Sequence, residues 1–132
     1  MKIINCFVIT ILLVLSCSEN STIVGKWTTY GNETNTKTPI EAQTVVTYKD
    51  NGTYEEISLV SLFGAKVEMR FYGTYRLEGD KLITKQMQSV IDGKTKVEEK
   101  PEEKSTIITL NSKELVYKEE HAKHNMRFSR IE

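Results

Sequence analysis

The chain has 132 residues, with 18 basic and 18 acidic side chains and a formal net charge of zero. This balance argues against a nucleic-acid partner, which a strongly basic surface would attract, and against any partner selected by net charge alone. The length allows one domain with a substantial core and is too short for two.

The first segment, residues 1–16, has the layout of an export signal. Lys2 supplies a positive charge, and the stretch from Ile3 to Leu15 is apolar except for Asn5 and Thr10. This stretch is too short to cross a bilayer as a helix, which takes about 20 apolar residues. We therefore expect residues 1–16 to be a signal peptide that is removed and takes no part in the fold.

Val14-Leu15-Ser16-Cys17 resembles the lipobox, the cleavage motif of bacterial lipoproteins. The resemblance implies that Cys17 carries a diacylglycerol thioether and an acylated amine, and two or more acyl chains anchor a protein stably to a membrane. Residues 17–22 would then be the lipidated cysteine and a tether that reaches roughly 17 Å at most. The expected location is the bacterial cell envelope, at the outer membrane, with the domain in the periplasm or at the cell surface. The alternative is a secreted protein with a chance cysteine.

Cysteine usage constrains the domain further. Cys6 and Cys17 are the two cysteines of the chain, and the first would leave with the signal while the second carries lipid. The domain would therefore have no disulfide, although it is exported to a compartment that permits them. Its stability must come from its core.

The rest of the chain, residues 23–132, is predicted to be a single domain of short strands. Lys66 to Leu77 shows the clearest alternation of apolar and polar residues, which is typical of a strand with one buried face. Asn51-Gly52 and Asp92-Gly93 are typical of tight hairpin turns. No window predicts a helix. The expected strands are 23–29, 42–49, 53–63, 66–77, 81–91, 94–98, 105–110, 114–119 and 125–131.

Two segments interrupt this pattern. Tyr30 to Glu41 is polar and contains Gly31 and Pro39, so we expect a long loop there. Glu98 to Lys104 is highly charged around Pro101 and is expected to form a solvated turn. Regular short strands separated by turns predict an all-β barrel or sandwich.

Four motifs resemble those of lipocalins and of bacterial lipocalin-like domains. Gly25-Lys26-Trp27 matches their Gly-x-Trp motif, while 48–54 (YKDNGTY), 73–77 (GTYRL) and 110–117 (LNSKELVY) resemble later signatures of the bacterial group. The resemblance implies a single antiparallel up-and-down β-barrel of about eight strands. Because nine strands are expected, one of them should be spurious or broken. A shared fold says little about function.

The resemblance also implies that a basic residue of the last strand packs on the tryptophan of the first. Arg127 and Arg130 are the candidates, and they lie three residues apart, so their side chains point to opposite faces. In a closed barrel the first and last strands pair, which would place a guanidinium over the indole of Trp27. Between the two arginines we predict Arg130. Gly25, which precedes Trp27 by two residues, would allow another segment to approach closely.

The sequence contains no convincing set of catalytic or metal-binding groups. His121 and His124 lie three residues apart in a turn, and a metal site needs three or four converging ligands. Glu55-Glu56 and Glu98-Glu99 are adjacent pairs whose side chains would face opposite ways in a strand. No activated serine motif and no phosphate loop is present. We therefore expect no enzyme activity, no cofactor and no metal.

Aromatic residues and a methionine provide the remaining indication of function. They fall at positions expected to face the barrel interior, where they would either fill the core or line a cavity for a small apolar ligand with one polar group. In the second case the protein is a membrane-tethered binding module. In the first it is a structural or interaction lipoprotein that acts through its surface and loops. The candidate ligand-binding residues are Tyr48, Tyr54, Met69, Phe71, Tyr75, Tyr117 and Phe128.

Overall fold

The computed structural model describes residues 22–30 and 41–131, and within them it contains nine strands and no helix. The signal peptide, Cys17, most of the tether and most of the expected loop lie outside the described residues. Each strand lies within a few residues of an expected one. The strands are β1 (Gly25–Tyr30), β2 (Glu41–Tyr48), β3 (Thr53–Leu62), β4 (Ala65–Glu78), β5 (Lys81–Ile91), β6 (Lys94–Val97), β7 (Glu103–Leu110), β8 (Glu114–Glu119) and β9 (Met126–Arg130).

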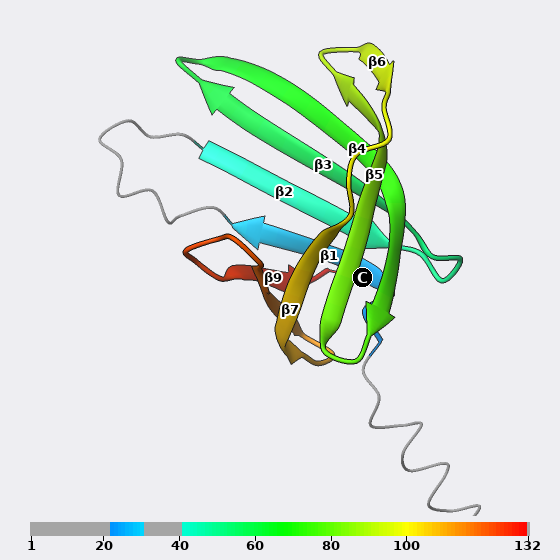
Figure 1. The fold of residues 1–132 in the computed structure, drawn as a ribbon. Helices are drawn as coiled ribbons and strands as arrows, with labels where there is room; N and C mark the ends of the chain where they lie inside the picture. Colours follow the sequence, from blue (N-terminus) through cyan, green and yellow to red (C-terminus); the bar gives the residue numbers. More distant parts are fainter. Residues whose placement is uncertain (1–21, 31–40, 132) are drawn as a thin grey trace, which may run out of the picture.

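Eight of these strands close into an antiparallel barrel (Figure 1). Strands β1 to β5 pair consecutively, β5 pairs with β7, β7 to β9 pair consecutively, and β9 returns to β1. Closure leaves no free sheet edge around the ring. The predicted single up-and-down barrel, consistent with the lipocalin-like resemblance, is confirmed.

The ninth strand is neither spurious nor broken, which corrects the expectation from the sequence. β6 forms a hairpin with the second half of β5, from Gln88 to Ile91, and stays outside the ring. The first half of β5, from Lys81 to Thr84, pairs with β7. β5 is long enough, at 11 residues, to hold two partners in succession along the same edge. The Asp92-Gly93 turn, with positive φ at both residues, joins β5 to β6.

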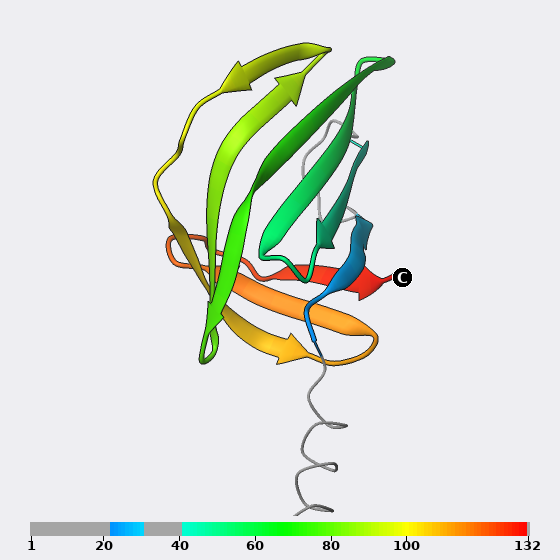
Figure 2. The same ribbon diagram turned by 90° about the vertical axis from the view of Figure 1, so that its right-hand side faces the viewer.

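The two ends of the barrel differ because the strands differ in length. β3, β4 and β5 have 10, 14 and 11 residues, whereas β8 and β9 have 6 and 5. Figure 2 shows the long strands extending well past the short ones at one end, while β7, β8 and β9 cross the other end. One end of the interior is therefore closed by neighbouring strands, and the other is enclosed less completely.

Gly73 marks a close approach in the barrel wall. A Cβ at this position would lie 2.1 Å from the carbonyl oxygen of Lys85 and 2.7 Å from the ring of Tyr54. The β4–β5 register shifts between Tyr72 and Gly73, which opposes an extra residue of β5 to β4 and bends both strands. A larger residue here would push β4 away from β5, so the glycine permits the curvature that closes the barrel.

The core occupies the closed end of the barrel. Its buried members come from β1, β2, β3, β5, β8 and β9, and from Ile23, just before the first strand. Tyr75, Ile107, Leu110 and Tyr117 are partly buried and pack against them. The buried members are Ile23, Trp27, Val46, Tyr48, Tyr54, Leu82, Leu115 and Phe128.

Candidate functional site

The closed end is fixed by a contact between the first and last strands. Trp27 is fully buried, and the guanidinium carbon of Arg130 lies 4.3 Å from the centre of its ring. Arg130 also donates hydrogen bonds to the carbonyl oxygens of Val24 (3.0 Å) and Thr22 (2.6 Å). The indole Nε1 of Trp27 donates to the carbonyl of Ile23 at 2.8 Å. These contacts hold the segment that enters β1 across the end of the barrel.

The predicted choice between the two arginines is confirmed. Arg130 faces inward opposite Trp27 in the β1–β9 register, whereas Arg127 is exposed and pairs with Glu114 at 3.2 Å. Gly25 adopts a φ of +142°, which side chains other than glycine rarely allow. The glycine is therefore required by its own backbone conformation as the chain enters β1.

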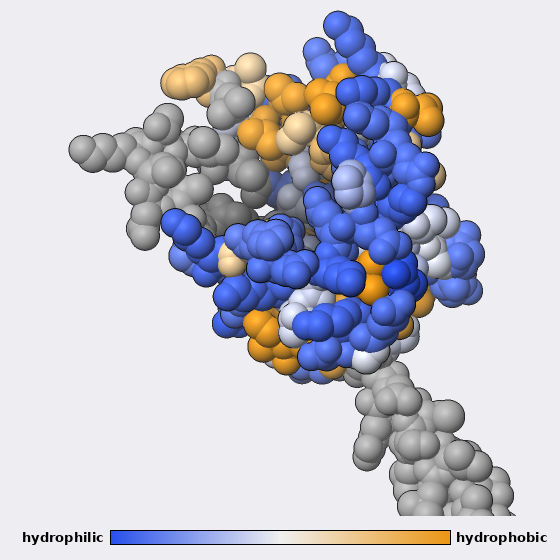
Figure 3. Space-filling view, in the orientation of Figure 1, coloured by the Kyte–Doolittle hydropathy of each residue, from blue (hydrophilic) through white to orange (hydrophobic). Residues whose placement is uncertain are grey.

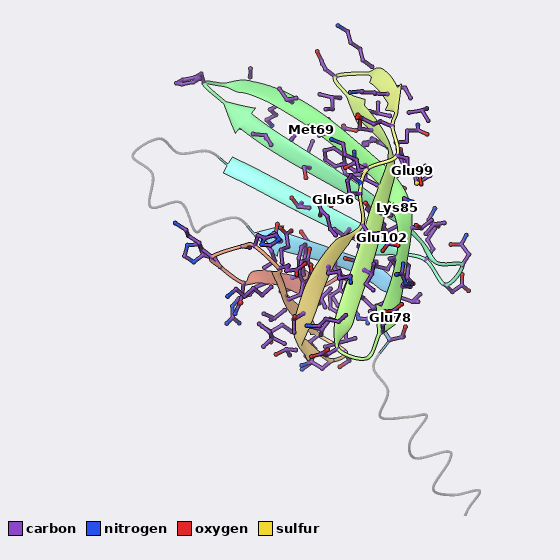
Figure 4. The ribbon with its side chains drawn as sticks, in the orientation of Figure 1. Glu56, Met69, Glu78, Lys85, Glu99 and Glu102 are labelled. Carbon is purple, nitrogen blue, oxygen red and sulfur yellow. The ribbon has the colours of Figure 1, made fainter. Side chains whose placement is uncertain are left out.

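A cavity of about 230 Å³ occupies the interior toward the other end. Its floor consists of the buried or partly buried lining residues Val46, Leu82, Tyr48, Tyr54 and Tyr117. Its mouth consists of the exposed lining residues Lys100, Pro101, Glu103 and Glu119. Figure 4 marks Glu56 on β3, among these residues. The lining consists of Val46, Tyr48, Tyr54, Glu56, Phe71, Leu82, Thr84, Gln86, Lys100, Pro101, Glu103, Ser105, Tyr117 and Glu119.

Three tyrosine rings from different strands meet at the cavity floor. The rings of Tyr48 and Tyr54 are 6.3 Å apart, and Tyr117 stacks on Phe128 at 5.4 Å. Tyr48 is 4% exposed and Tyr54 is 8% exposed. No described residue forms a hydrogen bond with the hydroxyls of Tyr48, Tyr54 and Tyr117. By contrast, the hydroxyl of Tyr75 donates a hydrogen bond to the carbonyl oxygen of Lys49 at 2.6 Å. Buried hydroxyls usually have a partner, so these three are available to a ligand or to water.

The electrostatics of the cavity are unfavourable to negative charge. Burial raises the pKa of the Glu56 carboxyl, and Glu119 and Glu103 raise it further, while a hydrogen bond from the Ser58 hydroxyl at 3.5 Å opposes the shift. Burial raises the pKa of Tyr54 to about 12, with Glu56 and Glu103 adding to the effect. Each of these groups therefore holds its proton more tightly than it would in water.

Three of the seven residues predicted to bind a ligand do not line the cavity. Tyr48, Tyr54, Phe71 and Tyr117 line it. Phe128 lies in the closed core, and Tyr75 packs edge-on against Tyr48 with ring centres 5.0 Å apart. Met69 lies further along β4, opposite Ser58 and Ile91, and is labelled in Figure 4.

The polar half of the lining was missed from the sequence. Glu55 and Glu56 do face opposite ways, as expected, but Glu56 points inward on the same face as Tyr54 and Ser58. Glu103 and Glu119 come from β7 and β8, far along the chain. The available signal was the two-residue spacing of Glu56 from Tyr54, which places both on one face of β3. The cavity is consequently more polar than its aromatic residues alone predict.

On the outer surface, in contrast to the cavity, glutamate side chains form ion pairs with basic residues. Among the residues that the structure describes, seven exposed or half-exposed glutamates form ion pairs with arginine or lysine. Examples are the pair between Lys85 and Glu99 and the Arg76–Glu102 pair at 2.7 Å. Figure 3 shows this hydrophilic face, with apolar side chains gathered near β6 and the ends of β3 and β4. The paired glutamates are Glu55, Glu68, Glu78, Glu98, Glu99, Glu102 and Glu114.

No three histidine, cysteine, aspartate or glutamate side chains of residues 22–30 and 41–131 are grouped so as to hold a metal ion. His121 lies in a shallow hollow beside Glu102 and Glu120, and His124 does not line it. Within these residues there is also no helix of the length and apolarity needed to span a bilayer.

Comparison with known proteins adds no assignment. No protein-family model matches the chain, and no curated protein is significantly similar to it.

Proposed function

We propose that this protein is a lipid-anchored binding module of the bacterial cell envelope, which holds a small molecule in the cavity of its barrel. The observation that carries the proposal is the cavity itself, where three tyrosine hydroxyls lie within reach of a ligand and are not engaged by described residues. The aromatic rings suit an apolar body, and the hydroxyls and carboxylates suit a polar group on it. A binding role needs no catalytic residues.

The anchor part of the proposal rests on the Val14–Cys17 motif and on the position where the core begins. Ile23, 2% exposed, is already part of the core, so few residues separate it from Cys17. Such a short tether would keep the domain close to the membrane surface. We expect Cys17→Ala to leave the chain unlipidated and released from membrane fractions, as measured by fractionation after feeding a clickable fatty acid. A wild-type chain that takes up no label would contradict the anchor.

The binding part is tested by native mass spectrometry of the full chain, released from a neutral detergent. We expect a small molecule to remain bound, and Thr84→Phe to abolish its retention because Thr84 lines the cavity. Thr74→Phe is the matched control, since Thr74 is exposed on the adjacent strand β4. An unoccupied wild-type protein, or equal retention by both variants, would count against binding in the cavity.

A second candidate is an interaction lipoprotein that works through its outer surface. The cavity is smaller than the roughly 300 Å³ at which ligand pockets usually begin. The outside of β2 and β3 also carries a hollow of about 260 Å³, lined in part by Val45, Ile57 and Leu59. Loss of a protein partner in Ile57→Asp, with small-molecule retention unchanged, would favour this role.

A further inference from the structure

We propose that the molecule bound in the cavity is a small organic cation, such as an arylalkyl ammonium, held by Glu56, Glu103 and Glu119 above the tyrosine rings. The inference rests on the proposed binding function and specifies the chemistry of its ligand. It follows from three lining glutamates that form no ion pair with described residues, from hydroxyls at the floor that have no partner among those residues, and from the size of the space. Of the three glutamates, Glu56 is partly buried, and Glu103 and Glu119 are exposed at the mouth.

The glutamates that line the cavity have no cationic partner in the part of the chain that the structure describes. None of Glu56, Glu103 and Glu119 forms an ion pair with a described residue, whereas seven glutamates on the outer surface do. Lys100 is the one basic side chain among the lining residues, so the lining carries an excess of negative charge. Glu56 is partly buried, and its negative charge is unfavourable there unless a cation neutralises it, whereas Glu103 and Glu119 are exposed at the mouth of the cavity.

Glu103 and Glu119 act on Glu56 although the three residues belong to three different strands. Glu119 and Glu103 raise the pKa of Glu56, and Glu56 and Glu103 raise that of Tyr54. A cation placed beside Glu56 would oppose the rise in its pKa because it favours the ionised form of the carboxyl group. The arrangement of the lining therefore favours a positively charged guest over a negative one.

The tyrosines at the floor provide an independent indication of a ligand. Tyr48 and Tyr54 both line the cavity and are 4% and 8% exposed. The hydroxyl of each has no hydrogen-bond partner among the described residues. A hydroxyl oxygen can accept a hydrogen bond from an ammonium group, and the ring faces attract cations. Tyrosine rings combined with carboxylates suit an organic ammonium better than an anion or a wholly apolar molecule.

Two further observations narrow the ligand class. The absence of a metal-holding group of acidic and histidine side chains from the described residues argues against a bare metal ion as the guest. At about 30 Å³ for each water-sized unit, a volume of about 230 Å³ accommodates a molecule of roughly eight non-hydrogen atoms. This size fits a single ring or short chain that carries one ammonium group.

Isothermal titration calorimetry with three probes of similar size and different charge tests the inference on the full chain in a neutral detergent. The probes are phenethylammonium, the neutral 2-phenylethanol and the anion phenylacetate. We expect the cation to bind at least about tenfold more tightly than the neutral probe, the anion to show no binding, and the preference to weaken as salt is added.

A matched pair of variants ties the preference to the cavity. Glu56→Gln removes a charge inside the barrel and should weaken binding of the cation by about tenfold while leaving the neutral probe unaffected. Glu55→Gln removes a charge from the adjacent residue on the outer face and should leave both affinities unchanged. Micelle partition of the probes is the same for both variants and therefore cancels in the comparison.

The outcomes separate this inference from the proposed function. Equal binding of cation and neutral probe, or equal effects of Glu56→Gln and Glu55→Gln, would overturn the cation inference and leave the binding function standing. A cation that fails to bind at millimolar concentration would also overturn it. The proposed function itself fails only if the wild-type chain retains no small molecule or if Thr84→Phe and Thr74→Phe retain it equally.

Discussion

The two ends of the barrel interior satisfy their polar groups in opposite ways. At the closed end, the charge of Arg130 is covered by the Trp27 ring and by the carbonyls of Thr22 and Val24. At the cavity end, Glu56 lacks a cationic partner, and the Tyr48 hydroxyl makes no hydrogen bond with the described residues. At the closed end the protein's own groups engage the guanidinium through its ring contact and two of its nitrogens, although its Nε is buried without a hydrogen-bond partner among the described residues. At the cavity end the carboxyl group has no cation from the described residues beside it.

The difference indicates where stability and function reside in this fold. A buried charge that is held by several contacts rigidifies its surroundings, and removing one of its partners leaves the charge less well compensated. A half-buried charge without a partner lowers stability, but it leaves binding energy available to a guest. We therefore expect substitutions at the closed end to affect folding and substitutions at the cavity end to affect mainly pH dependence and binding.

The largest expected effect is that of Trp27→Ala. Trp27 is fully buried in the first strand and lies opposite Arg130 of the last strand. Its replacement by alanine should therefore lower the free energy of unfolding by about 3–5 kcal/mol. Chemical denaturation followed by circular dichroism measures this change. Because Trp27 is the single tryptophan of the chain, its fluorescence should be blue-shifted in the native wild type. Emission like that of indole in water would contradict its role as the centre of the closed end.

Arg130→Ala should lower the free energy of unfolding by a smaller amount, about 2 kcal/mol. The substitution removes a cation–π contact and two hydrogen bonds to backbone carbonyls. A double-mutant cycle with Trp27→Phe should show coupling, because the guanidinium and the ring are in direct contact. Arg127→Ala is the matched control on the outer face of β9, and it should cost little and show no coupling. Equal effects of the two arginine substitutions would remove the distinction between the two faces of the last strand.

Sequence reasoning succeeded at the closed end because the relevant signals there are local or follow from closure. Alternation and turn residues placed the strands, and the need for the first strand to meet the last brought Arg130 to Trp27. The face of Arg130 relative to Arg127 follows from their spacing of three residues. The position of β6 outside the ring could not be predicted in this way, because no local sequence signal shows that β5 pairs with β7 along its first half and with β6 along its second half.

The cavity end was harder to predict because it depends on the register of distant strands. Glu56, Glu103 and Glu119 are each ordinary in their local sequence, and only the closed ring brings them to one space. Whether the aromatic residues fill the interior or leave room also depends on strand length and tilt. The inward direction of Tyr54 and Tyr117 could be predicted, but the free volume beside them could not.

The smallest expected change in stability is that of Glu56→Gln in the ligand-free protein. This change is also the most specific to the cavity end. Because burial raises the pKa of Glu56 in the folded state, folding favours its protonated form. The stability that this form contributes is present below the unfolded pKa and is lost as the pH rises through the folded pKa. Glu56→Gln should therefore be slightly more stable than the wild type at neutral pH, and the difference should vanish toward pH 4, as thermal melts at several pH values would show.

The comparison with Glu55→Gln makes this prediction specific to the cavity. Glu55 lies on the outer face and approaches Arg70 at 3.7 Å, so its loss should be neutral or slightly destabilising at neutral pH. Glu103, Glu119, Lys100 and the cavity tyrosines all face Glu56, and they are present in both variants. A destabilised Glu56→Gln would mean that its carboxylate is already balanced within the protein. A stabilised Glu56→Gln that has also lost the ammonium ligand would show that the same charge weakens the empty barrel and binds its guest.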